Sequence, residues 1–133
     1  MSSSSRSDPV DRVVYEGASE ARPGQGVLEA LEAAELIAIA PSNPFVSIGP
    51  ILAVDEIRAA VERRRESVVA VSPLIGGRAV KGPADAMFQS LAGGTGAGQV
   101  TDCYKGLIDA LVLDEADADD AREVAERGVR PLV

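Results

Sequence analysis

The chain has 133 residues, of which 46% are apolar, 26% charged and only 3% aromatic, an ordinary composition for one globular domain with its own core. Its 21 acidic residues against 13 basic ones give a net charge of −8, which argues against binding nucleic acid or an anionic membrane. Because histidine is absent and only one cysteine is present, the sequence excludes Ser-His-Asp and Cys-His catalysis, histidine-containing metal sites and thiolate zinc sites.

Residues 1–11 are expected to form a disordered tail ahead of one folded region over residues 12–133. The tail is serine-rich and lacks the apolar stretch of a signal peptide. No apolar run approaches the roughly 18 to 20 residues of a membrane span. Cys103 is the only cysteine, so it cannot form an internal disulfide, and we expect a cytoplasmic protein.

Apolar runs alternate with helical spacing along the whole folded region. The apolar runs predict strands at residues 12–16, 36–40, 68–71, 108–113 and 129–133. The helical spacing predicts helices at residues 24–35, 55–65 (capped by Asp55), 84–92, 100–107 and 116–127. This alternation predicts an α/β fold around a mostly parallel sheet, in which ligands bind beyond the carboxyl ends of the strands. Those ends are followed by residues 41–50, 72–82 and 114–117.

The first of these loops, residues 41–50, contains three prolines that restrict its backbone. Ser47 is suited to cap a following helix, and Pro50 is suited to the first turn of that helix. Free N–H groups at the helix start, together with the Ser42, Asn43 and Ser47 side chains, would form a phosphate site. A plain strand-to-helix connection with a capping serine explains the same residues equally well.

The second loop brings two cations into a lysine-poor chain. Gly76 and Gly77 permit a sharp turn, and Arg78 and Lys81 follow it. These cations are suited to neutralise a phosphate at a strand end, so we favour a binding role over a solvated hairpin.

Other patterns have simpler interpretations. Gly94-x-Gly96-x-Gly98 follows a predicted helix and does not have dinucleotide-fingerprint spacing, so we interpret residues 92–99 as a flexible linker. The acidic residues at 114–120 could ligate Mg²⁺, but stabilising a helix N-terminus is the favoured explanation. Residues 63–65, three arginines between glutamates, are interpreted as a solvated helix end, and Cys103 as a small apolar residue.

Three blocks of sequence, "APSNPFVSIGPILAVDEIRAAV", "VVAVSPLIGGRAVKGPADAM" and "LIDALVLDEAD", together resemble one family in order and spacing. It is the 2-phospho-L-lactate transferases of deazaflavin coenzyme F(420) biosynthesis, and the resemblance covers about residues 12–133. It implies a Rossmann-like, three-layer α/β enzyme that is usually homodimeric and Mg²⁺-dependent. It also implies transfer of a phospholactyl or enolpyruvyl phosphate group from a guanosine diphosphate-linked donor to a deazaflavin alcohol, with release of GMP.

The resemblance assigns roles to particular residues. It places the nucleotide–phosphate site at Ser42, Asn43, Pro44, Ser47, Ile48 and Gly49, with Ser72, Pro73 and Gly82 nearby. Lys81 would stabilise charge during transfer as the catalytic residue. No metal ligands are assigned.

The chain also departs from the family. Family members are longer, and their N-terminal half carries a glycine-rich turn and the acidic residues that bind metal and deazaflavin. Where many members have histidine before a tyrosine, this chain has Cys103 before Tyr104. We therefore expect a partial, inactive C-terminal portion that forms a homodimer or associates with a missing N-terminal half. The alternative is a nucleotide or nucleotide-sugar binding regulatory module without catalysis.

The surplus of acidic residues also suggests a source. A chain rich in acid and poor in lysine suits a salt-saturated cytoplasm, because salt screens the repulsion between its charges. The sequence therefore favours a halophilic, haloarchaeal origin, although an ordinary acidic protein fits the composition equally well.

Overall fold

The computed structural model describes residues 12–79, 87–88, 91 and 93–133. The predicted tail and two predicted site residues, Lys81 and Gly82, lie outside the described residues, as does most of the helix predicted at residues 84–92. In the part described, no helix is long and apolar enough to cross a membrane.

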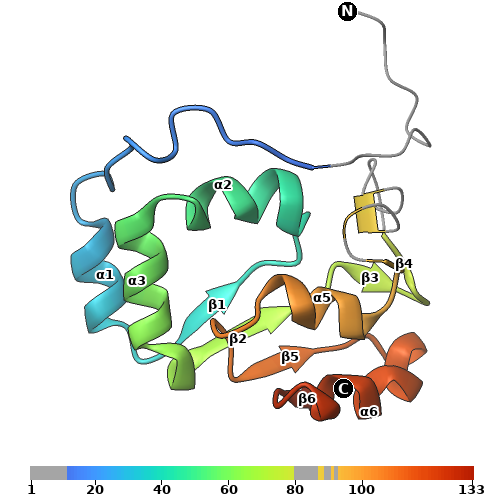
Figure 1. The fold of residues 1–133 in the computed structure, drawn as a ribbon. Helices are drawn as coiled ribbons and strands as arrows, with labels where there is room; N and C mark the ends of the chain where they lie inside the picture. The colour runs from blue at the N-terminus through green and yellow to red at the C-terminus, as the bar shows by residue number, and fades with distance from the viewer. Residues whose placement is uncertain (1–11, 80–86, 89–90, 92) are drawn as a thin grey trace, which may run out of the picture.

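The centre of the fold is a four-stranded parallel sheet with the order β1-β2-β5-β6 (Figure 1). Its strands are β1 (Ile37–Ile39), β2 (Val68–Val71), β5 (Ala110–Val112) and β6 (Arg130–Leu132). All four lie inside predicted strands. A separate antiparallel hairpin pairs β3 (Leu74–Ile75) with β4 (Arg78–Ala79). The α/β class with a parallel sheet, as a partial Rossmann-like domain, is thereby confirmed.

The described helical segments alternate with these strands. They are α1 (Val27–Ala33), η1 (Pro44–Ile48), α2 (Gly49–Leu52), α3 (Asp55–Arg63), η2 (Arg65–Ser67), α5 (Ala97–Cys103), η4 (Glu115–Asp120) and α6 (Ala121–Glu126). The apolar side of α3 is as predicted, with Ala60 and Val61 buried. Its cap position is Val54, so the prediction that Asp55 caps this helix is wrong by one residue.

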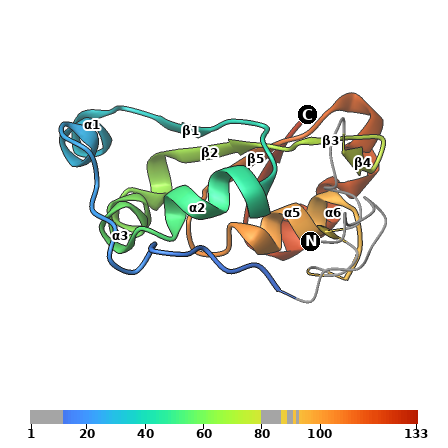
Figure 2. The same ribbon diagram turned by 90° about the horizontal axis from the view of Figure 1, so that it is seen from above.

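The helices α2, α3, α5 and α6 lie on one side of the sheet, which Figure 2 shows from above. Each strand is added beside the one before it, so right-handed crossovers bring the connecting helices to the same side. The core lies between these helices and the sheet. Val68, Ala70 and Leu111 of the strands, Val100 of α5 and Tyr104 just after α5 are completely or almost completely buried.

Two predicted segments differ from the structure. The strand predicted at residues 12–16 does not form. This segment runs beside α2 instead, and the Tyr15 side chain bonds to the carbonyl oxygen of Phe45 in η1. The glycine-rich stretch is not a linker: Gly96 is the cap of α5, whose first residues Ala97 and Gly98 are buried. Packing of this short helix against the core overrides the weak helix propensity of glycine.

Candidate functional site

Two of the predicted loops leave the sheet at adjacent positions. In the β1–β2 pair Ile39 is opposite Ala70, and in the β2–β5 pair Val71 is opposite Val112. Because the three strands are parallel, the segments that follow them begin along one edge of the sheet. The structure thus brings together the start of residues 41–49, Ser72 and Asp114, as the sequence predicted.

Asn43 organises the first of these segments. It is the N-cap of the π-helical turn η1, and its Oδ1 accepts hydrogen bonds from the backbone N–H groups of Phe45 (2.8 Å) and Val46 (3.2 Å). The backbone N–H groups of Ser47 and Ile48 bond to the Asn43 carbonyl oxygen. These four donors are therefore satisfied within the chain.

Two predictions about this loop are corrected by that geometry. Ser47 does not cap a helix, because it lies inside η1 and Asn43 occupies the cap position. The N–H groups that we expected to be free for an anion are used by Asn43. The prediction that Pro50 lies in the first turn of the next helix is confirmed for α2.

The two serine hydroxyls are the polar groups that this loop leaves available. Ser42 is partly buried and Ser47 is exposed. Neither side chain hydrogen-bonds to another described residue, so both hydroxyls can donate to a ligand. Ile48 and Gly49 contribute differently: Ile48 packs against the core, and Gly49 provides room for a neighbouring ring.

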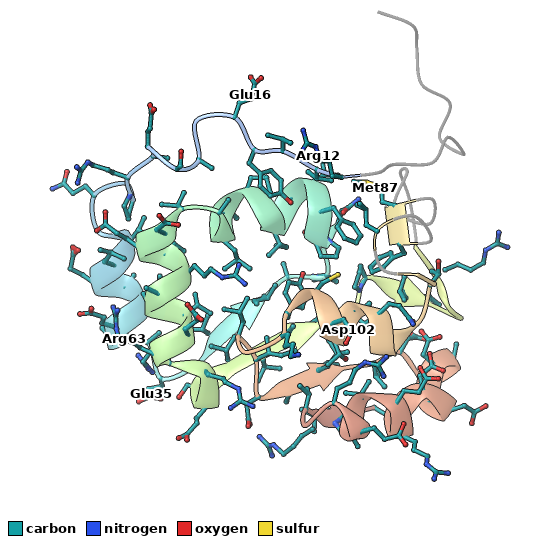
Figure 3. The ribbon with its side chains drawn as sticks, in the orientation of Figure 1. Arg12, Glu16, Glu35, Arg63, Met87 and Asp102 are labelled. Atoms are coloured by element: carbon teal, nitrogen blue, oxygen red, sulfur yellow. The ribbon has the colours of Figure 1, made fainter. Side chains whose placement is uncertain are left out.

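Residues distant in the sequence fix the position of the loop. Phe45 packs edge-to-face on buried Phe88, with ring centroids 5.1 Å apart and planes at 71°. Asn43 Nδ2 lies 3.7 Å from the sulfur of Met87, which Figure 3 labels beside α2. Pro44 is buried as well. The loop is therefore held in one shape before any ligand binds.

Tyr15, which precedes the loop in the sequence, also fixes its position. Its hydroxyl donates a 2.5 Å hydrogen bond to the carbonyl oxygen of Phe45. Burial, and to a lesser extent the thiol of Cys103, raise the pKa of Tyr15, so its phenol remains protonated at neutral pH. Sequence reasoning missed Tyr15, Met87 and Phe88 as supports of the loop. The rarity of aromatic residues in this chain was the one available signal.

Ser72 and Pro73 are both buried, which limits what they can offer a ligand. Ser72 is 8% exposed, and its Oγ accepts a hydrogen bond from the Leu74 backbone N–H at 3.2 Å. Its own backbone N–H extends the sheet by bonding to Val112. Ser72 thus shapes the start of the second loop, and its hydroxyl hydrogen is the group left for a ligand.

The favoured interpretation of the acidic segment, stabilisation of a helix N-terminus, is confirmed for Asp114. Asp114 is the N-cap of η4 and accepts a hydrogen bond from Ala116 N–H at 2.9 Å. Across the described residues, no group of three or more Asp, Glu or Cys side chains is arranged to hold a metal ion.

Cys103 also behaves as predicted, as a packed apolar residue. Burial, and secondarily the Asp102 carboxylate, raise its pKa to about 11, so the thiol is neutral at physiological pH. It packs against the core beside Tyr104, whose pKa is also raised by burial. Neither group is suited to act as a nucleophile at this edge of the sheet.

The arrangement defines a class: a Rossmann-like α/β protein with a rigid, hydroxyl-bearing loop at the carboxyl edge of its parallel sheet. The sequence matches the family described as "2-phospho-L-lactate transferase CofD" over residues 2–131. The chain belongs to the CofD family.

Relatives at about 40% identity are transferases of two names. The chain is 42% identical over 125 residues to a phosphoenolpyruvate transferase from Thermobifida fusca (strain YX), covering 93% of this chain and 38% of that protein. It is 38% identical over 112 residues to a 2-phospho-L-lactate transferase from Methanococcus maripaludis (strain S2), covering 84% of this chain and 36% of that protein. The chain thus spans less than two fifths of the length of these relatives.

Proposed function

We propose that this chain provides the donor-nucleotide part of a transferase in coenzyme F(420) biosynthesis. The reaction moves a 2-phospholactyl or enolpyruvyl phosphate group from a guanosine diphosphate-linked donor to the ribityl hydroxyl of a deazaflavin alcohol. The acceptor oxygen forms a new bond to phosphorus, the phosphoanhydride bond breaks, the hydroxyl proton is released, and GMP leaves. Family membership and the names of the relatives support this proposal.

One observation carries the proposal to particular residues. In a chain of this family, the rigid loop after β1 lies beside the loop that begins at Ser72, and it carries the hydroxyls of Ser42 and Ser47, which bond to no other described residue. Hydroxyl donors and a fixed loop at the carboxyl edge of a parallel sheet suit a nucleotide phosphate. Ser42 and Ser47 are the proposed phosphate contacts, and Asn43 is the positioning residue that holds them.

Lys81 is the proposed source of positive charge. Phosphoryl transfer depends mainly on positioning and on neutralising charge at the transferring group, and a lysine ammonium does this as a point charge. Mg²⁺ is expected for the reaction, but no three acidic side chains gather among the described residues, so no step is assigned to the ion. Its ligands would be phosphate oxygens and groups outside the described residues.

Titration calorimetry with GDP and Mg²⁺ in high salt tests the binding part of the proposal. Saturable binding that weakens at least about tenfold in Ser42→Ala and in Lys81→Ala is the expected result, about 1.4 kcal/mol for each substitution. Lys105→Ala is the matched control, because it removes the other lysine from an exposed position after α5. Absence of GDP binding to the wild-type chain would contradict the proposal.

Transfer is tested separately from binding. The chain is mixed with the region of the Thermobifida fusca relative that the match does not include, and product is measured with a guanosine diphosphate-linked donor and a deazaflavin alcohol. Product formation supports the transferase. Binding of GDP or of a nucleotide sugar without product would favour the regulatory binding module instead.

A further inference from the structure

Asp117 is a buried acidic residue at the carboxyl edge of the sheet. It lies in η4, the segment that follows β5, and it is only 5% exposed. Its Oδ2 is buried and accepts no hydrogen bond in the part of the chain that the structure describes. Burying a carboxylate oxygen without a donor costs free energy, and buried polar groups in native proteins are nearly always paired.

The elements that pack against η4 use their donors elsewhere. These elements are the hairpin strand β3 and the helix α5. In β3 the Leu74 backbone N–H donates to Ser72 Oγ, and at the start of α5 the Ala97 backbone N–H donates to Asp120 Oδ2 at 3.3 Å. Among the described residues, therefore, burial of the Asp117 carboxylate lowers the stability of the chain, and a bound group that donates to this carboxylate would offset that loss.

The position of Asp117 suits contact with a ligand that lies along the carboxyl edge. Neighbouring strands are about 4.8 Å apart, so the segments that follow β1 and β5, two strands apart, begin roughly 10 Å from each other. A nucleotide with its phosphates at Ser42 and Ser47 can span this separation with its sugar and base. The 3-10 segment η4 has a kink at Asp117 (φ −109°, ψ 17°), and a kink in such a segment permits local movement toward a ligand.

The chemistry of a carboxylate distinguishes one base from another. An ionised carboxylate only accepts hydrogen bonds, and its two oxygens can accept from two neighbouring N–H groups. Guanine presents such a pair on one edge, N1–H and the 2-amino group. Adenine presents N1, an acceptor, beside its amino group, so its edge would place an acceptor against the carboxylate.

We propose that Asp117 selects guanine in the donor nucleotide by accepting hydrogen bonds from N1–H and from the 2-amino group. This inference rests on the proposed function, and it adds a contact with the base to the phosphate contacts at Ser42 and Ser47. It also gives a reason for a buried acid that no described residue pairs: a side chain that binds a ligand can lower the stability of the free protein.

Thermal unfolding without ligand is the first test. Asp117→Asn should raise the midpoint of unfolding by at least about 3 °C, because a neutral amide costs less free energy to bury than a carboxylate. Asp119→Asn is the matched control, because Asp119 is exposed on the same segment, and it should leave the midpoint unchanged. A midpoint that is unchanged or lower in Asp117→Asn would show that the fold itself uses this carboxylate, and it would overturn the proposal.

Titration calorimetry with GDP, ADP and inosine diphosphate is the second test. Wild type and Asp119→Asn should bind GDP at least about tenfold more tightly than ADP, and also more tightly than inosine diphosphate, which lacks the 2-amino group. Asp117→Asn should bind GDP at least about tenfold more weakly than wild type and should lose the preference for GDP over ADP. Circular dichroism checks folding, and Asp117→Ala decides the result if Asp117→Asn does not fold.

The outcomes separate this proposal from the nucleotide site as a whole. GDP binding that depends on Ser42, with the same base preference in Asp117→Asn as in wild type, would overturn the role of Asp117 and leave the proposed function intact. A rise in the unfolding midpoint with Mg²⁺ alone that is absent in Asp117→Asn would identify a cation as the ligand, and it would also overturn the proposal. Absence of GDP binding to wild type would contradict the proposed function together with the role of Asp117.

Discussion

The hydroxyl of Tyr15 donates a 2.5 Å hydrogen bond to the carbonyl oxygen of Phe45, which joins residues 30 positions apart in the sequence. The ring that makes this bond also lies against Gly49, where α2 begins. A segment outside the sheet thereby fixes the loop that we propose to bind phosphate.

Gly49→Ala should destabilise the protein by about 1–3 kcal/mol, because the added methyl group overpacks this contact. A Cβ at Gly49 would lie 2.0 Å from the Tyr15 hydroxyl oxygen and 2.9 Å from the Pro44 carbonyl oxygen. The backbone itself would accept alanine, since Gly49 has φ −52° and ψ −48°. Chemical denaturation measures the change in the free energy of unfolding.

Gly24→Ala is the control for that substitution. A Cβ there would lie 3.8 Å from Val27 Cγ2, an ordinary contact. The free energy of unfolding of this variant should therefore stay within about 0.5 kcal/mol of the wild-type value. If Gly49→Ala is as stable as Gly24→Ala, the packing of the Tyr15 ring on Gly49 is refuted.

Asn43→Ala should lower the free energy of unfolding by about 0.5–2 kcal/mol, because the N–H groups of Phe45 and Val46 lose their acceptor. Asn43→Asp keeps a side-chain oxygen in the same place and should retain most of the stability. Thermal melts of the two variants in parallel give the comparison. Equal losses in both variants would show that the contact with Met87, and not the cap, is what matters at this position.

Arg64→Ala should destabilise the protein by about 2 kcal/mol. The Arg64 guanidinium donates to the carbonyl oxygens of Leu31 (2.8 Å) and Glu32 (2.7 Å) near the end of α1 and also to that of Ala34. Arg64→Lys should destabilise the protein by less than Arg64→Ala, because one ammonium cannot reach all these carbonyls in the guanidinium's geometry.

Exposed Arg58 on α3 provides the control for Arg64. Arg58→Ala should change the free energy of unfolding by no more than about 0.5 kcal/mol. Denaturation curves for Arg64→Ala and Arg58→Ala that coincide would restore the interpretation of this arginine run as a solvated helix end.

Cys103 should react slowly with iodoacetamide in the folded protein, because burial raises its pKa to about 11. At pH 8 the rate should be on the order of 100-fold lower than in denaturant, and it should rise as the pH approaches 11. A rate profile with its midpoint at or below pH 9 would contradict this prediction.

The same shift has a consequence for stability. A raised pKa in the folded state means that the unfolded chain loses the thiol proton first as the pH increases. The stability that Cys103 contributes is therefore fully present below about pH 8.5 and is lost as the pH rises toward about 11. Tyr15 and Tyr104 also have raised pKa values, so the difference between wild type and Cys103→Ala isolates the thiol.

Local pattern was enough to predict most of the architecture. The runs around β1, β2 and β5 are apolar over several consecutive residues, and a buried parallel strand has this signature whatever its neighbours are. The position of the loops could also be predicted, because parallel strands all end at the same edge of the sheet. The family resemblance rested on contiguous blocks such as residues 42–44 and 47–52, and the CofD match confirmed it.

The sequence by itself therefore determined the fold class, the edge of the sheet at which the loops meet, and the family. The tertiary structure decided that Asn43 and not Ser47 caps η1, that residues 12–15 run beside α2 instead of forming a strand, and that Arg64 binds the end of α1. Strands and helices depend on the periodicity of neighbouring residues, which can be read along the chain. Tyr15 and Arg64 meet partners 30 or more positions away, and only the folded arrangement brings those atoms together.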